Sequence, residues 1–150
     1  MTDDLKMSAV LPEVATYYRF EDFRKLADQT LDCEEKMIYY WGAVENLADV
    51  FSEDYERDYY IPTRLQRGIA LKLIIPDSPL LEAYQENDAA QKRETRALPP
   101  EMMMDGSFMI HDDIVVYFGD VNEKYALEIK APSLARSLKM MFNNAWNNMG

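Results

Sequence analysis

The stretch from Arg64 to Asp77, RLQRGIALKLIIPD, constrains the fold of this chain more than any other. Its first residues carry the cations typical of a last helical turn, and Gly68 supplies the left-handed residue with which helices commonly end. Residues 69–75 are almost entirely apolar, which indicates a strand covered on both faces, as in the centre of a parallel or mixed sheet. Residues 76–79 end that strand and can cap another helix. Helix, glycine, buried strand and capped helix together predict an α/β fold.

The rest of the chain can be arranged around that strand as one domain. Its 150 residues are 48% hydrophobic and 12% aromatic, which suffices for a single core. Strands are expected over residues 15–20, 37–42, 94–98, 107–110, 114–118 and 125–129, and helices over 21–33, 45–51, 52–67, 78–92 and from 132 onward. In the meander over residues 107–129, the period-two spacing predicts burial of Phe108, Ile110, Val115, Tyr117, Leu127 and Ile129. The expected fold class is therefore α/β, a mixed sheet with helices packed on it.

Charge and cysteine content exclude several classes of function. The formal net charge of −11 argues against direct binding of nucleic acid, which depends on clustered cations, and against binding to a membrane surface. One cysteine, Cys33, and one histidine, His111, cannot form a zinc site of the usual type, so we expect no metal and no cofactor. No apolar run approaches the length of a membrane span, and no signal peptide is visible, so a cytoplasmic protein is expected.

Several segments, taken in order, resemble a known family. They are TLDCEEK, RGIALKLIIPD, RETRALP, HDDIVVYFGD and FNNAW. Together they resemble the effector domain of TrmB-type transcription regulators, which has a phospholipase-D-like fold. The resemblance covers residues 15–146 and implies a tail or linker stub over 1–14 followed by an effector domain over 15–150. The family's N-terminal winged helix-turn-helix does not fit into residues 1–14, so DNA binding is expected to come from another chain or domain.

The catalytic motif of the phospholipase-D-like enzymes can also be compared with this sequence. Active phospholipase-D-like enzymes carry His-x-Lys, four residues, Asp, and then Gly-Ser-x-Asn. In this sequence Asp112 and the stretch from Gly119 to Asn122 resemble the later part of that pattern. Asp105 stands at the histidine position and Ser107 at the lysine position, so the nucleophile and the phosphate-binding cation are both replaced. The chain is therefore expected not to be an enzyme, and His111 is interpreted as a turn residue beside Asp112.

A ligand site is expected beyond the carboxyl ends of the parallel strands, where ligands commonly meet α/β sheets. Trp41 and Asp77 end two such strands, Arg96 belongs to the adjoining one, and Asp105 and Ser107 replace the catalytic pair. An aromatic face with carboxylates and a hydroxyl suits a neutral, sugar-like, polyhydroxylated ligand. The alternative is a structural pocket closed by the methionines of EMMMDG.

The leading hypothesis is a non-catalytic effector domain of a TrmB-like regulator that binds a small ligand or a partner subunit. A dimerisation or scaffold module without a ligand and a degenerate phospholipase-D-like enzyme remain as alternatives. Assembly as a homodimer, or with a partner regulator, is expected to use the last helix. Its apolar stripe includes Phe142 and Trp146, and burial of these side chains in the monomer core is the competing interpretation.

Overall fold

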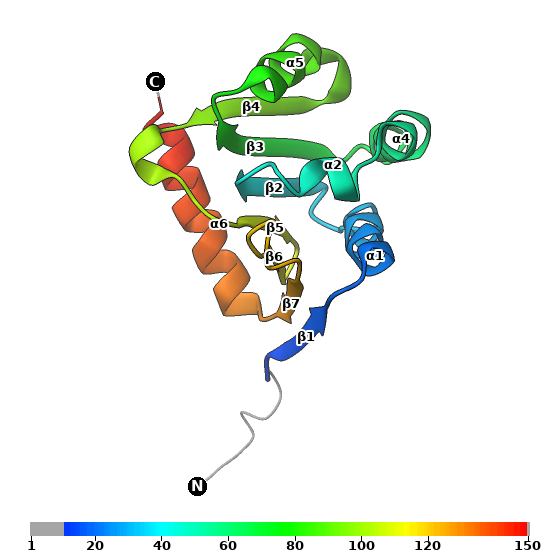
Figure 1. Ribbon diagram of the computed structural model, residues 1–150, viewed down its shortest axis with the longest axis vertical. Coiled ribbons are helices and arrows are strands. Elements are labelled where there is room, and N and C mark those ends of the chain that lie inside the picture. Colours follow the sequence, from blue (N-terminus) through cyan, green and yellow to red (C-terminus); the bar gives the residue numbers. More distant parts are fainter. Residues whose placement is uncertain (1–10, 150) are drawn as a thin grey trace, which may run out of the picture.

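The computed structural model describes residues 11–149, which form a seven-stranded mixed sheet between two layers of helices (Figure 1). The strand order is β1-β7-β6-β5-β2-β3-β4. The strands are β1 (Glu13–Tyr17), β2 (Met37–Gly42), β3 (Ala70–Pro76), β4 (Arg93–Leu98), β5 (Ser107–His111), β6 (Ile114–Phe118) and β7 (Ala126–Lys130). The helices are α1 (Phe20–Thr30), α2 (Leu47–Val50), α3 (Glu53–Tyr55), the π-helix η2 (Glu56–Tyr60), α4 (Ile61–Gln66), α5 (Pro79–Asn87), the 3-10 helices η3 (Ala89–Gln91) and η4 (Pro100–Met102), and α6 (Pro132–Asn147).

The strand predicted to be central is β3. It runs parallel to β2 on one side and to β4 on the other. Ile74 and Ile75 within it are completely buried, because helices cover both faces of the sheet. The preceding helix α4 ends at Gln66, and Gly68 follows in the left-handed conformation with φ of 70°. Ser78 caps α5 by accepting a hydrogen bond from the Leu81 N–H at 3.3 Å. The helix, the glycine, the strand covered on both faces and the capped helix are confirmed, but β3 lies next to the edge strand β4 rather than at the centre of the sheet.

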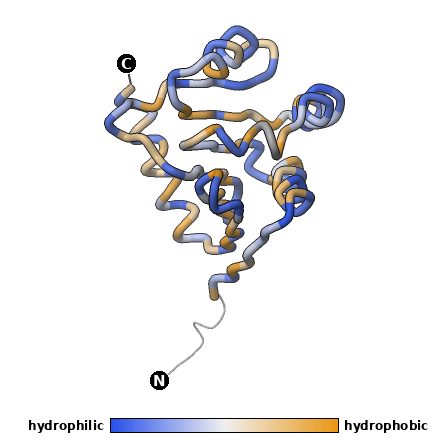
Figure 2. The backbone as a smooth tube through the Cα atoms, viewed as in Figure 1, coloured by the Kyte–Doolittle hydropathy of each residue, from blue (hydrophilic) through white to orange (hydrophobic). Residues whose placement is uncertain are grey.

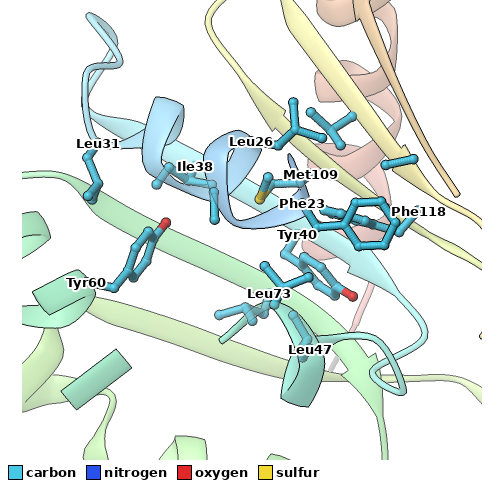
Figure 3. Packing of buried hydrophobic residues seen from close by; sticks show 14 of the residues in the cluster. Phe23, Leu26, Leu31, Ile38, Tyr40, Leu47, Tyr60, Leu73, Met109 and Phe118 are labelled. Carbon is cyan, nitrogen blue, oxygen red and sulfur yellow. The ribbon is translucent and has the colours of Figure 1, made fainter. Parts of the chain in front are cut away.

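Most helices cover one face of the sheet, and α6 covers the other (Figure 1). The larger core lies beneath α1, α2, α4 and α5, where Phe23, Leu26 and Leu31 pack on Tyr40, Met109 and other strand residues (Figure 3). On the opposite face, Phe142 and Trp146 of α6 pack on strand residues. Figure 2 shows the same division, with hydrophobic strands at the centre and hydrophilic outer turns on α4 and α5.

The helix expected over residues 52–67 contains a π turn. Pro62 lies in the first turn of α4, where its missing N–H costs least. Immediately before it, the Ile61 N–H donates to the Glu56 carbonyl, five residues back, instead of four. The π turn therefore joins α3 to α4, which begins at Ile61 with Pro62 in its first turn.

The meander is formed as expected, with β5, β6 and β7 antiparallel. On the predicted face, Ile110 and Val115 are buried against α6, whereas the other four residues expected to be buried are only half-buried: Phe108, Tyr117, Leu127 and Ile129. The opposite face is buried more completely, since Met109, Val116 and Phe118 join the larger core. β1 is also antiparallel, and it pairs with β7 at the far edge of the sheet.

The expected division at residue 15 remains a prediction. Residues 1–10 of the proposed tail lie outside the described residues, and β1 itself begins at Glu13.

Candidate functional site

The two positions that correspond to the catalytic histidine and lysine of the phospholipase-D motif, Asp105 and Ser107, lie at one end of β5. Asp105 is exposed in the loop before β5, whereas Ser107, the first residue of β5, is buried. Gly42, at the end of β2, pairs with Ser107. The Ala43 N–H donates to the Gly106 carbonyl at 3.0 Å. A Cβ on Gly42 would lie 2.5 Å from that same carbonyl oxygen. Backbone atoms therefore fill the space between these segments.

Asp112 lies at the other end of the β5–β6 hairpin. Its carboxylate accepts hydrogen bonds from the N–H groups of Glu34, at 2.9 and 3.1 Å, and Glu35, at 2.9 Å. This side chain therefore fastens the hairpin turn to the segment after α1. His111, expected as a turn residue, is instead the buried last residue of β5, and burial lowers the pKa of its imidazole. Neither ring nitrogen has a hydrogen-bond partner among the described residues.

The proposed site residues are divided between the two faces of the sheet. Trp41 packs against Phe142 of α6, with ring centroids 5.9 Å apart. Arg96 lies on the same face, where its guanidinium donates to the Trp146 carbonyl at 2.6 Å and lies over the Trp146 ring. Ser107 faces the other way, because side chains alternate along β5 and Met109 belongs to the larger core. Asp77 is exposed after β3. The structure thus brings Trp41 and Arg96 to one helix and separates Ser107 from them.

A groove of about 680 Å³ opens beside Trp41, between α6 and the segment around η4. Its floor is the Trp41 side chain, which is only 8% exposed. The indole Nε1 is buried and has no hydrogen-bond partner among the described residues. On the rim, Met140 is 72% exposed and Met141 is 56% exposed. The lining consists of Trp41, Pro99, Met102, Met140, Met141, Asn144, Ala145, Asn148 and Met149. We refer to this feature as the Trp41 groove.

Sequence reasoning identified Trp41 but not the groove around it. The alternative of a pocket closed by the EMMMDG methionines agrees with the structure at Met102, which lines the groove. The methionines of α6 and Met149 were not connected with it. Ten methionines in 150 residues were the available signal, since methionine is common at adaptable binding surfaces.

A second, narrow cavity lies on the other side of the sheet, between the π turn and α5. Its volume is about 30 Å³, which is room for roughly two water molecules. Glu56 lines it and accepts a hydrogen bond from the Tyr84 hydroxyl at 3.3 Å. Burial raises the pKa of Glu56, while nearby Arg93 and Arg64 oppose that shift. This cavity is too small for an organic ligand, so the Trp41 groove is the better candidate site.

Within residues 11–149, no group of three or more His, Cys, Asp and Glu side chains is placed to hold a metal ion. None of the helices in that part of the chain is long and apolar enough to cross a membrane.

No family model and no curated protein matches the chain, but solved structures do. NucT from Helicobacter pylori has a TM-score of 0.68 at 12% identity, over 93% of this chain and 98% of NucT. TrmBL2, an archaeal chromatin protein, has a TM-score of 0.61 at 18% identity, over 91% of this chain and 51% of TrmBL2. The fold is phospholipase-D-like. A polyphosphate kinase from Porphyromonas gingivalis also shares it, with a TM-score of 0.59 at 10% identity, over 88% of this chain and 25% of the kinase.

These similarities confirm the expected resemblance to a TrmB-type protein at the level of fold. This phospholipase-D-like domain spans about half the length of TrmBL2.

The expectation that the chain is not an enzyme is wrong. It rested on Asp105 and Ser107 at the nucleophile and cation positions, but a polyphosphate kinase is among the proteins that share this phospholipase-D-like fold. The missing motif concerns one reaction, whereas one fold can support several kinds of chemistry.

The expectation of no direct contact with nucleic acid is also wrong. TrmBL2 has the same fold, and its structure shows a novel mode of DNA binding. The net charge of −11 describes the whole chain, whereas phosphate contacts depend on local cations. Arg136 is exposed on α6, a helix of 16 residues without Asp or Glu, whereas Lys139 on the same helix pairs with Glu35 at 2.7 Å.

Proposed function

We propose that this phospholipase-D-like domain is the binding domain of a transcription regulator and that the Trp41 groove holds its small ligand. The fold likeness to TrmBL2 supports the regulator class. The observation that carries the binding role is that Trp41, whose buried Nε1 has no hydrogen-bond partner among the described residues, lines a ligand-sized groove. A buried donor without an acceptor costs roughly 1–3 kcal/mol, which a bound acceptor can recover. The ligand is neutral, a class that includes the polyhydroxylated molecule expected from the sequence.

Thermal unfolding with neutral compounds, maltose among them, tests this proposal. A ligand at a hundred times its Kd should add about 2.7 kcal/mol to the free energy of unfolding. For a chain of this size, that gain raises Tm by roughly 5–11 °C. Trp41→Phe keeps an aromatic ring but removes the N–H donor, and we expect it to weaken binding about tenfold.

The unliganded variant serves as the control, because its own Tm measures any loss of packing. Compounds that stabilise wild type and Trp41→Phe equally would place the ligand site elsewhere.

Assembly through the outer face of α6 is a second candidate function. Phe142 and Trp146, the residues expected in the interface, are 0% and 4% exposed in this chain's own core. A partner would instead contact the stripe of Leu134, Met141 and Asn148, which are spaced by seven residues and exposed. The absence of acidic residues in α6 favours such a contact in a chain of net charge −11, because two copies repel each other elsewhere.

Sedimentation equilibrium of Leu134→Glu tests assembly separately, since Leu134 does not line the Trp41 groove. If α6 forms a dimer interface, wild type should sediment as a dimer and Leu134→Glu as a monomer. A monomeric wild type at 100 µM, on the order of ten times a typical weak-dimer Kd, would remove this candidate.

A further inference from the structure

The lining of the Trp41 groove contains no charged side chain, although 29% of the chain is charged. An ion entering the groove would lose hydration and gain no opposite charge in return. An uncharged ligand avoids that cost. This inference about the ligand depends on the proposed function, because it concerns the same groove.

The polar groups of the groove are few, and some are already engaged. Asn148 Nδ2 donates to the Asn144 carbonyl at 2.7 Å and lies 3.4 Å from Asn144 Oδ1. The remaining lining is indole, proline, alanine and methionine. A ligand with many hydroxyl groups would bury several donors against thioether sulfurs, which are weak acceptors. A mostly apolar ligand meets this surface without that loss.

Trp41 is held rigidly in the sheet, whereas the methionines that line the groove with it can adjust. Trp41 lies in β2, with hydrogen-bonded strands on both sides, and its ring packs edge-on against Phe142. The methionine side chains around it are unbranched and can change rotamer to admit a ligand. Because Nε1 is buried, a ligand reaches it only when lining side chains move, and a donor already fixed in the sheet then favours binding, since little order must be created at the hydrogen bond itself.

We propose that the Trp41 groove binds an uncharged, largely apolar small molecule and that a carbonyl or hydroxyl oxygen of this molecule accepts a hydrogen bond from Trp41 Nε1. The ligand lies against the methionines of α6 and of the segment around η4. This differs from the sugar-like ligand expected from the sequence, because the groove offers one unpartnered buried donor and little else that is polar.

The test uses 6-propionyl-2-(dimethylamino)naphthalene, a neutral fluorophore with one ketone oxygen, titrated with the whole chain. We expect a blue-shifted emission that saturates at one probe per chain. Trp41→Phe should raise the Kd about tenfold, because the ring remains and one hydrogen bond is lost. Met141→Glu should raise it by at least about tenfold, because an exposed rim position gains a charge without disturbing the core.

Met103→Glu is the matched control. Met103 is 60% exposed and does not line the groove, so the same change of residue and charge should leave the Kd unaltered. Each variant's Tm without the probe reports whether it remains folded.

Three results would overturn the inference. An unchanged Kd in Trp41→Phe would remove the indole donor from the interaction. Binding of maltose but not of the fluorophore, lost in Trp41→Phe, would restore the sugar-like ligand and leave the proposed function intact. Failure of both probes, together with a wild-type dimer that Leu134→Glu dissociates, would assign this face of α6 to assembly and overturn the ligand-binding function as well.

Discussion

Replacement of Arg64 by methionine is expected to lower the free energy of unfolding by about 3 kcal/mol, although methionine suits a buried position. Arg64 is 1% exposed. Its guanidinium donates to the carbonyls of Ile69 at 2.8 Å, Gln91 at 2.6 Å and Lys92 at 3.4 Å. Methionine leaves these carbonyls without their donor, and each loss costs about 1–3 kcal/mol. Relief from burying a charge offsets part of this cost, since burial already lowers the pKa of Arg64.

Arg67→Met is the matched control for this prediction. Arg67 lies one helical turn further on, its side chain is 43% exposed, and it pairs with Asp32 at 3.0 Å. It also donates to the Leu31 carbonyl at 2.9 Å. Removal of an exposed ion pair and one hydrogen bond should lower the free energy of unfolding by about 1 kcal/mol. Urea unfolding measures both variants, and equal losses would contradict the role given to Arg64.

The two arginines show how far local patterns determine this fold. The sequence correctly places both at the end of a helix before a glycine and a buried strand. The pattern does not distinguish them, because cations at a helix end are favourable whether exposed or buried. Arg64 differs because it is enclosed by carbonyl acceptors, two of which, those of Gln91 and Lys92, come from a segment distant in the sequence. Contacts of this kind depend on how the elements pack, which periodicity does not reveal.

The site was harder to predict than the strands for the same reason. Trp41 and Ser107 each end or begin a strand, and this much follows from the sequence. Their faces depend on the register between β2 and β5, in which Gly42 pairs with Ser107. A shift of one residue would reverse the face of every side chain in β5. The methionine rim likewise joins η4 to the far end of α6, which no local pattern indicates.

Substitution of Gly42 by alanine should destabilise the protein by about 3–5 kcal/mol, because two costs add. The first is conformational, since Gly42 has a φ of 129°, which residues with a Cβ rarely adopt. The second is steric, since the new Cβ would lie 2.5 Å from the Gly106 carbonyl oxygen and 2.9 Å from Ser107 Cα. Both are backbone atoms held by the pairing of β2 with β5, so neither can move without disturbing the sheet.

Gly68→Ala separates these two costs. Gly68 also has a positive φ, 70°, but a Cβ there would meet nothing within 4 Å. Its substitution should therefore lower the free energy of unfolding by only about 1 kcal/mol. Alanine is strained in the left-handed conformation, but it also reduces the conformational entropy of the unfolded chain, which offsets part of that strain. Denaturant unfolding of both variants yields the difference, which we attribute to the contact between Gly42 and Gly106. Because Gly42 follows Trp41 directly, a sheet displaced at this point should also shift the indole and weaken binding of the naphthalene ketone. If Gly42→Ala is as stable as Gly68→Ala and binds that probe with unchanged affinity, the prediction is wrong. The backbone at this end of the sheet would then be able to move and accommodate the Cβ.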